Sequence, residues 1–261
     1  MKTALVIRHS AIETLARNFT SVLDEVGFSL LPLNIFDLAP SYERFQPPSL
    51  REVSFVIVLG GPQSANDGYP AFHQERQLLK DAMEGGTPVF GVCLGAQMMS
   101  LALGGDVTAS GGYSIGLRKI NVTAAGGSDP VFSRISIPLV PTLHGECFSL
   151  PRGGVLLADG FMLRRDSVYQ RIHMAFRYRN SYGFQFEPQL TLEELRTWTR
   201  EMADDYRLMG GQFDPEEEAA RSLREFTPYA PLYESQMRSL LRGFLENAGL
   251  VRGAGAAASA L

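Results

Sequence analysis

The sequence predicts an α/β protein with a mostly parallel sheet and helices on both faces. Residues 1–110 alternate short apolar runs with helical patterns, as parallel sheets covered on both sides do. The chain has 261 residues, of which 45% are hydrophobic, enough for one large core. A cysteine between two glycines, at 91–95, directly follows one apolar run. This pattern is typical of a nucleophile on a sharp strand-to-helix turn.

The elements of the parallel half follow in order from the N-terminus. Apolar runs at 4–7, 28–33, 55–59 and 89–92 predict four strands. Helical spacing of apolar residues predicts helices over about 12–26 and over 70–83. A further helix starts after the fourth strand and runs to about 103, where Gly104-Gly105 ends it.

The second half changes character twice. Residues 113–186 are extended and rich in turns, which predicts strands, several of them antiparallel, at 117–123, 138–142, 155–158, 175–178 and 182–186. From Thr191, a capping box and helical spacing predict a helix, followed by a long one over 232–248. Residues 252–261 lack a pattern and are expected to fray. We expect 1–190 to form the α/β domain and 191–261 a C-terminal helical extension packed on it.

Composition argues against several classes of partner. The formal net charge is −4 and the pI is about 5.6, so no basic face for nucleic acid is expected. No apolar run approaches the length of a membrane span, and Met1-Lys2-Thr3 leads directly into a strand rather than a signal peptide. With only two cysteines, a disulfide scaffold is not expected. These features favour a cytoplasmic protein without nucleic-acid or membrane partners.

Cys93 is the strongest candidate for chemistry. Most free cysteines are small buried hydrophobes, but the flanking glycines and Gln97 favour a nucleophile. Its position at a helix N-terminus predicts a partly exposed thiol of lowered pKa, which iodoacetamide labels before Cys147. The Leu94 N–H can face an oxyanion there.

Gly60-Gly61-Pro62 follows a buried strand at the edge where open α/β sheets bind ligands. An ordinary turn is one interpretation. A loop whose backbone N–H groups approach a ligand is the other, and the nearby cysteine motif favours it.

Taken together, these segments resemble the class I, or triad, glutamine amidotransferase family, especially stand-alone members similar to the glutaminase domain of GMP synthase. The resemblance continues through Ile115-Gly116, through 144–151 and through 182–189. It implies a flavodoxin-like fold in which Cys93 attacks a carboxamide, forms a γ-glutamyl thioester and releases ammonia. It also implies that Gly61 and Leu94 supply oxyanion-hole N–H groups and that Gln97 helps to hold the substrate.

The chain departs from this family at two positions. Where the family has its catalytic histidine and glutamate, this sequence has Glu187 and Gln189. A thiol near pKa 8.5 and a carboxylate near 4.3 differ by about four units, or roughly 6 kcal/mol, for proton transfer. If burial raises its pKa, however, a protonated Glu187 can hydrogen-bond the thiolate and later protonate a leaving amine. A glutamine at position 189 is consistent with this role, because a carboxylate is no longer needed there to orient an imidazole.

The four histidines are weaker candidates. His144 lies in a family-like segment, where a hydrogen-bonding role is favoured over that of a replacement base. His9 follows the first strand and is a candidate substrate contact, whereas His73 and His173 are expected to be structural. Their scattered spacing, and that of Cys147, predicts no zinc site, and no cofactor is expected.

The sequence therefore predicts a cysteine enzyme that cleaves or transfers at an amide of a γ-glutamyl-type or related acyl substrate. Its departures favour a role in specialised metabolism. The alternative is a catalytically inactive amidotransferase fold that serves as a binding or regulatory subunit. In either case a synthetase or acceptor would be a separate protein.

Overall fold

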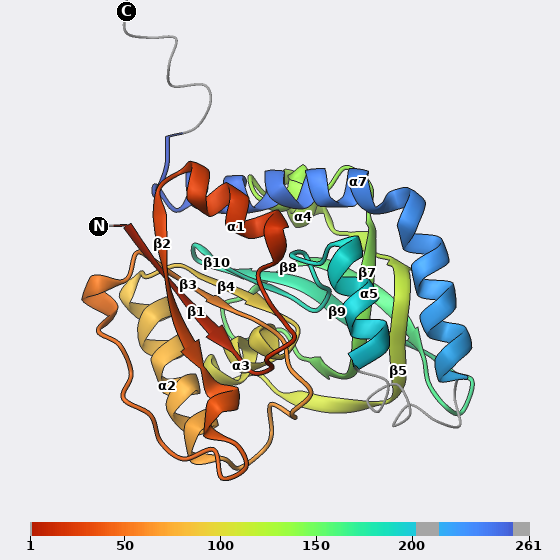
Figure 1. The fold of residues 1–261 in the computed structure, drawn as a ribbon, viewed down its shortest axis with the longest axis horizontal. Coiled ribbons are helices and arrows are strands. Elements are labelled where there is room, and N and C mark those ends of the chain that lie inside the picture. The colour runs from red at the N-terminus through yellow and green to blue at the C-terminus, as the bar shows by residue number, and fades with distance from the viewer. Residues whose placement is uncertain (1, 202–213, 253–261) are drawn as a thin grey trace, which may run out of the picture.

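The computed structural model describes residues 2–201 and 214–252, and its centre is a sheet of eight strands. Their order is β2-β1-β3-β4-β10-β9-β8-β6 (Figure 1). The first five strands run parallel: β2 (Phe28–Asn34), β1 (Lys2–Arg8), β3 (Phe55–Val58), β4 (Val89–Val92) and β10 (Ser181–Phe184). The predicted mostly parallel α/β architecture is confirmed.

The antiparallel strands complete the sheet and form a separate pair. β9 (Tyr169–Tyr178), β8 (Val155–Leu163) and β6 (Asn121–Val122) extend the main sheet, while β5 (Val107–Lys119) pairs with β7 (Leu139–Phe148). β5 begins ten residues before the predicted strand at 117. Its register with β7 shifts between Ala109 and Ser114, and Gly111 has φ +75°, so the regular alternation that marks a strand is interrupted.

Helices lie on both faces of the sheet (Figure 1). Those of at least nine residues are α1 (Ala16–Glu25), α2 (Pro70–Gly85), α3 (Leu94–Ala102), α5 (Leu192–Glu201) and α7 (Pro215–Asn247). The short ones are α4 (Ala124–Ser128) and 3₁₀ turns at Ile35–Leu38, Leu50–Glu52 and Phe132–Arg134.

Two helix boundaries differ from the prediction. α1 begins at Ala16 rather than near 12, because Ala16 has φ +50° and its N–H bonds the Thr14 hydroxyl instead of a helical carbonyl. The preceding residues form a loop at the carboxyl end of β1. α7 begins 17 residues before the predicted 232, and it contains Pro228 and Pro231, which normally indicate the end of a helix. Figure 1 shows this helix bent.

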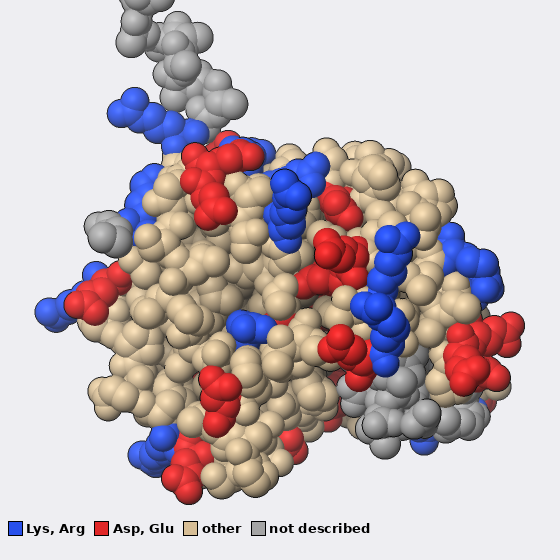
Figure 2. All heavy atoms as spheres, viewed as in Figure 1, with Lys and Arg blue, Asp and Glu red and all other residues tan. Residues whose placement is uncertain are grey.

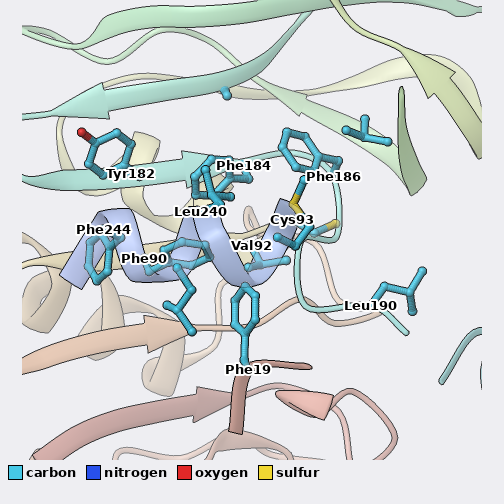
Figure 3. Close-up of a cluster of buried hydrophobic side chains, with 14 of the residues drawn as sticks. Phe19, Phe90, Val92, Cys93, Tyr182, Phe184, Phe186, Leu190, Leu240 and Phe244 are labelled. Atoms are coloured by element: carbon cyan, nitrogen blue, oxygen red, sulfur yellow. The ribbon is translucent and has the colours of Figure 1, made fainter. Parts of the chain in front are cut away.

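Each face of the sheet has its own core. On one face, α1 and α7 cover the aromatic side chains of β4 and β10, and the Phe90 and Phe244 rings lie 5.3 Å apart (Figure 3). On the other face, α2 and α3 pack Phe72 and Met98 against β1, β3 and β4. In the described part of the chain, no helix combines the length and apolarity needed to cross a bilayer.

Candidate active site

Cys93 occupies a strained turn between β4 and α3. Its φ of +48° and ψ of −109° are unusual for a residue with a side chain. The turn is tight: a Cβ on Gly91 would lie 2.3 Å from Met99 Sδ, and one on Gly95 would lie 2.3 Å from the Val58 carbonyl oxygen. The Cys93 N–H donates to the Phe184 carbonyl at 2.7 Å. These contacts explain why the cysteine has glycines on both sides.

The thiol faces a cavity of about 360 Å³ at the carboxyl edge of the parallel strands. In Figure 3, Cys93 lies beside Phe186, at the end of the aromatic cluster. The cavity is lined by Cys93, Gly61, Leu94, Gln97, His144 and Glu187, among others. These six are among the eight candidate site residues expected from the sequence. The other two, Gln189 and His9, are not among the described residues that line the cavity.

Glu187 is buried beside the nucleophile. Its carboxylate accepts a hydrogen bond from Gln189 Nε2 at 2.9 Å and lies close enough to the Cys93 thiol for the two groups to interact. Cys93 Sγ lies 3.9 Å from the Leu143 carbonyl oxygen. The backbone carbonyl of Glu187 accepts a bond from the Tyr233 hydroxyl of α7, also at 2.9 Å. Burial raises the pKa of Glu187 to about 7, against the opposing effect of the interactions with Gln189 and Cys93.

The Cys93 thiol is held in its protonated form. Its side chain is 7% exposed, and burial followed by the negative charges of Glu187 and Glu13 raises its pKa well above the ordinary value. The bond from the Leu94 N–H opposes this shift. The expectation of a partly exposed thiol with a lowered pKa is therefore wrong, because burial and two carboxylates together outweigh the effect of the helix N-terminus.

The Gly60-Gly61 loop lies directly against this turn. A Cβ on Gly60 would lie 3.3 Å from Cys93 Cβ, and one on Gly61 would lie 3.2 Å from Leu94 Cδ2. Backbone of this loop can therefore approach a group bound at the thiol only because both residues are glycine.

Gln97 and His144 hold the far wall of the cavity. Both contact the Glu146 carbonyl oxygen at 3.1 Å, from Gln97 Nε2 and from His144 Nδ1. Because a carbonyl only accepts hydrogen bonds, Nδ1 carries the proton. Burial lowers the pKa of His144 to about 4, so its ring is neutral at pH 7. The Glu146 carboxylate in turn accepts the Ser64 hydroxyl at 2.8 Å.

The other histidines lie elsewhere. His9 is fully buried, bonded to Glu75, and is not among the described residues that line the cavity, so its position does not support a substrate contact. His73 lies on α2 and His173 on β9. No group of three or more potential metal ligands occurs in residues 2–201 and 214–252.

Three residues at the site were missed from the sequence. Glu13 was assigned to a helix, although it lies in the loop before α1 and lines the cavity. Trp198 reaches the cavity from α5. Gln185 Nε2 lies 3.8 Å from Cys93 Sγ. Gln185 could have been found, since residues two apart in an extended segment share a face and Glu187 was already a candidate.

Comparison with known proteins agrees with this geometry. The model of the class-I glutamine amidotransferase family matches residues 14–205. The glutamine amidotransferase-like protein YfeJ of Salmonella typhimurium is 32% identical over 154 residues, 56% of this chain and 61% of YfeJ. GMP synthase of Thermobifida fusca is 28% identical over 165 residues, 59% of this chain but 28% of that protein.

Solved structures share the fold over nearly the whole chain. A glutamine amidotransferase from Thermotoga maritima is 25% identical with a TM-score of 0.73, covering 94% of this chain and 98% of that one. One from Methylobacillus flagellatus has a TM-score of 0.78 at 22% identity, covering 95% of each chain. The chain belongs to the class-I glutamine amidotransferase family.

Proposed function

We propose that this protein cleaves or transfers at an amide of a γ-glutamyl-type or related acyl substrate through a thioester on Cys93. The observation that carries the proposal is the buried pair of Cys93 and Glu187, whose side chains interact on the wall of a cavity of about 360 Å³. This pair holds a nucleophile and a proton acceptor at the same point.

Glu187 acts first as general base. As Cys93 Sγ bonds to the amide carbon, the thiol proton moves to the carboxylate, and the negative charge passes from Glu187 to the carbonyl oxygen of the substrate. The carboxylate charge that opposes ionisation of Cys93 is thereby neutralised in the same step. The raised pKa of Glu187, about 7, also makes its carboxylate a stronger base than an ordinary glutamate.

Glu187 then acts as general acid. The tetrahedral intermediate expels its nitrogen, which takes the proton from the Glu187 carboxyl, and the acyl group remains on Sγ as a thioester. Water or an acceptor amine then attacks the thioester, loses a proton to Glu187 and releases the thiol. The Gly61 and Leu94 N–H groups are proposed to bind the oxyanion both when the thioester forms and when it is cleaved.

The charges on the cavity wall favour a substrate that carries an ammonium group. Glu13, Glu146 and Glu187 line the cavity, and neither lysine nor arginine occurs among the described lining residues. The α-amino group of a γ-glutamyl compound is one such cation. We infer that Glu146, held by Ser64, binds it.

The family relationship also supports a separate partner. The GMP synthase relatives are named glutamine-hydrolysing, and the chain spans 28% of the length of the Thermobifida fusca protein. We infer that a synthetase or an acceptor outside this chain uses the released ammonia or the acyl group.

Intact mass spectrometry tests the proposal. The wild-type protein and Cys93→Ser are mixed with L-glutamine or with L-γ-glutamyl-p-nitroanilide and quenched in acid. We expect a γ-glutamyl adduct on Cys93 in the wild type and none on a thiol in Cys93→Ser. A ligand that raises the melting temperature without adduct or turnover would favour the inactive binding subunit instead.

A further inference from the structure

His9 and Glu75 form a buried pair beside the Gly60-Gly61 loop, and neither residue is among the described residues that line the cavity. Both side chains are 0% exposed, and His9 Nε2 lies 2.9 Å from Glu75 Oε2. His9 Nδ1 lies 3.1 Å from the Leu59 carbonyl oxygen. Neither residue has a part in the proton transfers proposed above.

The Leu59 carbonyl fixes the position of one proton on the His9 imidazole. A carbonyl oxygen only accepts hydrogen bonds, so Nδ1 carries a proton, and Nε2 shares a second proton with the Glu75 carboxyl group. Burial alone would lower the pKa of His9, but the charge and hydrogen bond of Glu75 and the backbone contacts raise it overall.

His9 interacts with four residues of the loop between Leu59 and Gln63. It bonds the Leu59 carbonyl, and the Gly60 backbone also raises its pKa, as an accepting carbonyl does. A Cβ on Gly61 would lie 2.5 Å from His9 Cβ. Gln63 Nε2 donates to the His9 carbonyl at 3.0 Å. The side chain and the backbone of His9 therefore both hold the loop in place.

We propose that the His9–Glu75 pair positions the Gly60–Gly61 peptide so that the Gly61 N–H faces the oxyanion. Because a peptide unit is planar and trans, a Gly60 carbonyl held toward the imidazolium directs the Gly61 N–H the opposite way. His9 and Glu75 are positioning residues, since neither lies among the described residues lining the cavity. The assignment rests on the proposed function, because it needs an oxyanion at Cys93.

Two reactions of Cys93 separate positioning from general damage. Acylation by L-γ-glutamyl-p-nitroanilide passes through an oxyanion, whereas alkylation by iodoacetamide does not. In Glu75→Gln, which keeps the size of the side chain but removes the charge, and in His9→Gln, we expect kcat for p-nitroaniline release to fall about ten- to hundredfold. KM and the alkylation rate should stay within about twofold of wild type, because the thiol and its cavity are intact.

The matched control is His73→Gln, a histidine on the exposed side of α2, which should behave as wild type. Folded His9→Gln and Glu75→Gln variants with wild-type kcat would overturn the assignment, as would acylation and alkylation falling in parallel. A wild type that forms no adduct contradicts the proposed function instead.

A measurement on the unmodified protein covers variants that fail to fold. In ¹⁵N spectra at pH 6, below the ordinary histidine pKa, both ring nitrogens of His9 should carry protons, because the pKa of His9 is raised. A neutral His9 ring at that pH would exclude the ion pair and with it this inference, whatever the variants do.

Discussion

At the residue scale, Glu187 has two effects on Cys93 that point in opposite directions. Its charge raises the thiol pKa, yet it is the proposed acceptor of the thiol proton. Glu187→Gln should therefore lower turnover by about 10²- to 10⁴-fold while it speeds alkylation of Cys93 by iodoacetamide. Steady-state kinetics and peptide mass spectrometry measure the two rates.

The control for this variant is Glu193→Gln, an exposed carboxylate on α5 that should leave both rates unchanged. If Glu187→Gln keeps wild-type turnover, the carboxylate is structural, and a proton acceptor has to be sought elsewhere in the cavity.

The same pair sets the expected pH dependence. In the active form of the proposed mechanism, the Cys93 thiol is protonated and the Glu187 carboxylate is ionised. Since the pKa of Glu187 is about 7 and that of Cys93 is raised, the rate should increase as pH rises through about 7 and fall only above the ordinary thiol range. A kcat/KM profile from pH 5 to 10 checks this. A first limb near pH 4 would show that Glu187 is not the controlling group.

At the element scale, α5 brings a second, partly buried carboxylate, that of Glu194, close to the site. Acidic and basic side chains lie side by side over this helix in Figure 2. Glu194 accepts the Thr14 hydroxyl, and burial raises its pKa to about 7, with a further contribution from Glu187.

This carboxylate should make stability depend on pH. The folded pKa is above the unfolded one, so the native state binds more protons between about pH 4.5 and 7, and stability falls as pH rises through that window. Glu194→Gln should therefore stabilise the protein at pH 8, by at most about 3 kcal/mol, with little effect at pH 4.5. Denaturant melts at both pH values measure this, and an equal effect at both would contradict it.

At the scale of the whole molecule, the C-terminal helix is part of the main core. The Phe244 ring of α7 lies 5.3 Å from that of Phe90 and 6.1 Å from that of Tyr182 (Figure 3). It also lies 5.7 Å from the ring of Phe55. Thus a residue near the end of the described chain packs on strands from its beginning and middle.

Phe244→Ala should lower the free energy of unfolding by about 3–5 kcal/mol, since it leaves a cavity among these rings. The comparison is Leu232→Ala on the same helix, where the side chain is 45% exposed and the loss should be under about 1 kcal/mol. Urea titrations of both variants give the difference. Equal losses would mean that α7 is an appendage with little share in the core.

Local features of the chain could be predicted because they depend on neighbouring residues. Alternating apolar runs specify the parallel strands, and the glycines around Cys93 specify a tight turn, since sterics act between adjacent residues. The start of α1 and the extent of α7 could not be predicted. Ala16 adopts a positive φ and α7 continues through two prolines, and in both cases tertiary contacts outweigh local preference.

The sequence by itself determined the fold class, the family resemblance and the nucleophile candidate. The tertiary structure decided the electrostatic environment of that nucleophile. Glu13, Cys93 and Glu187 lie far apart in the chain, and the pKa of the thiol depends on their burial and on charges acting through space. No pattern of adjacent residues records those distances, so the helix N-terminus alone gave the wrong sign for the thiol pKa.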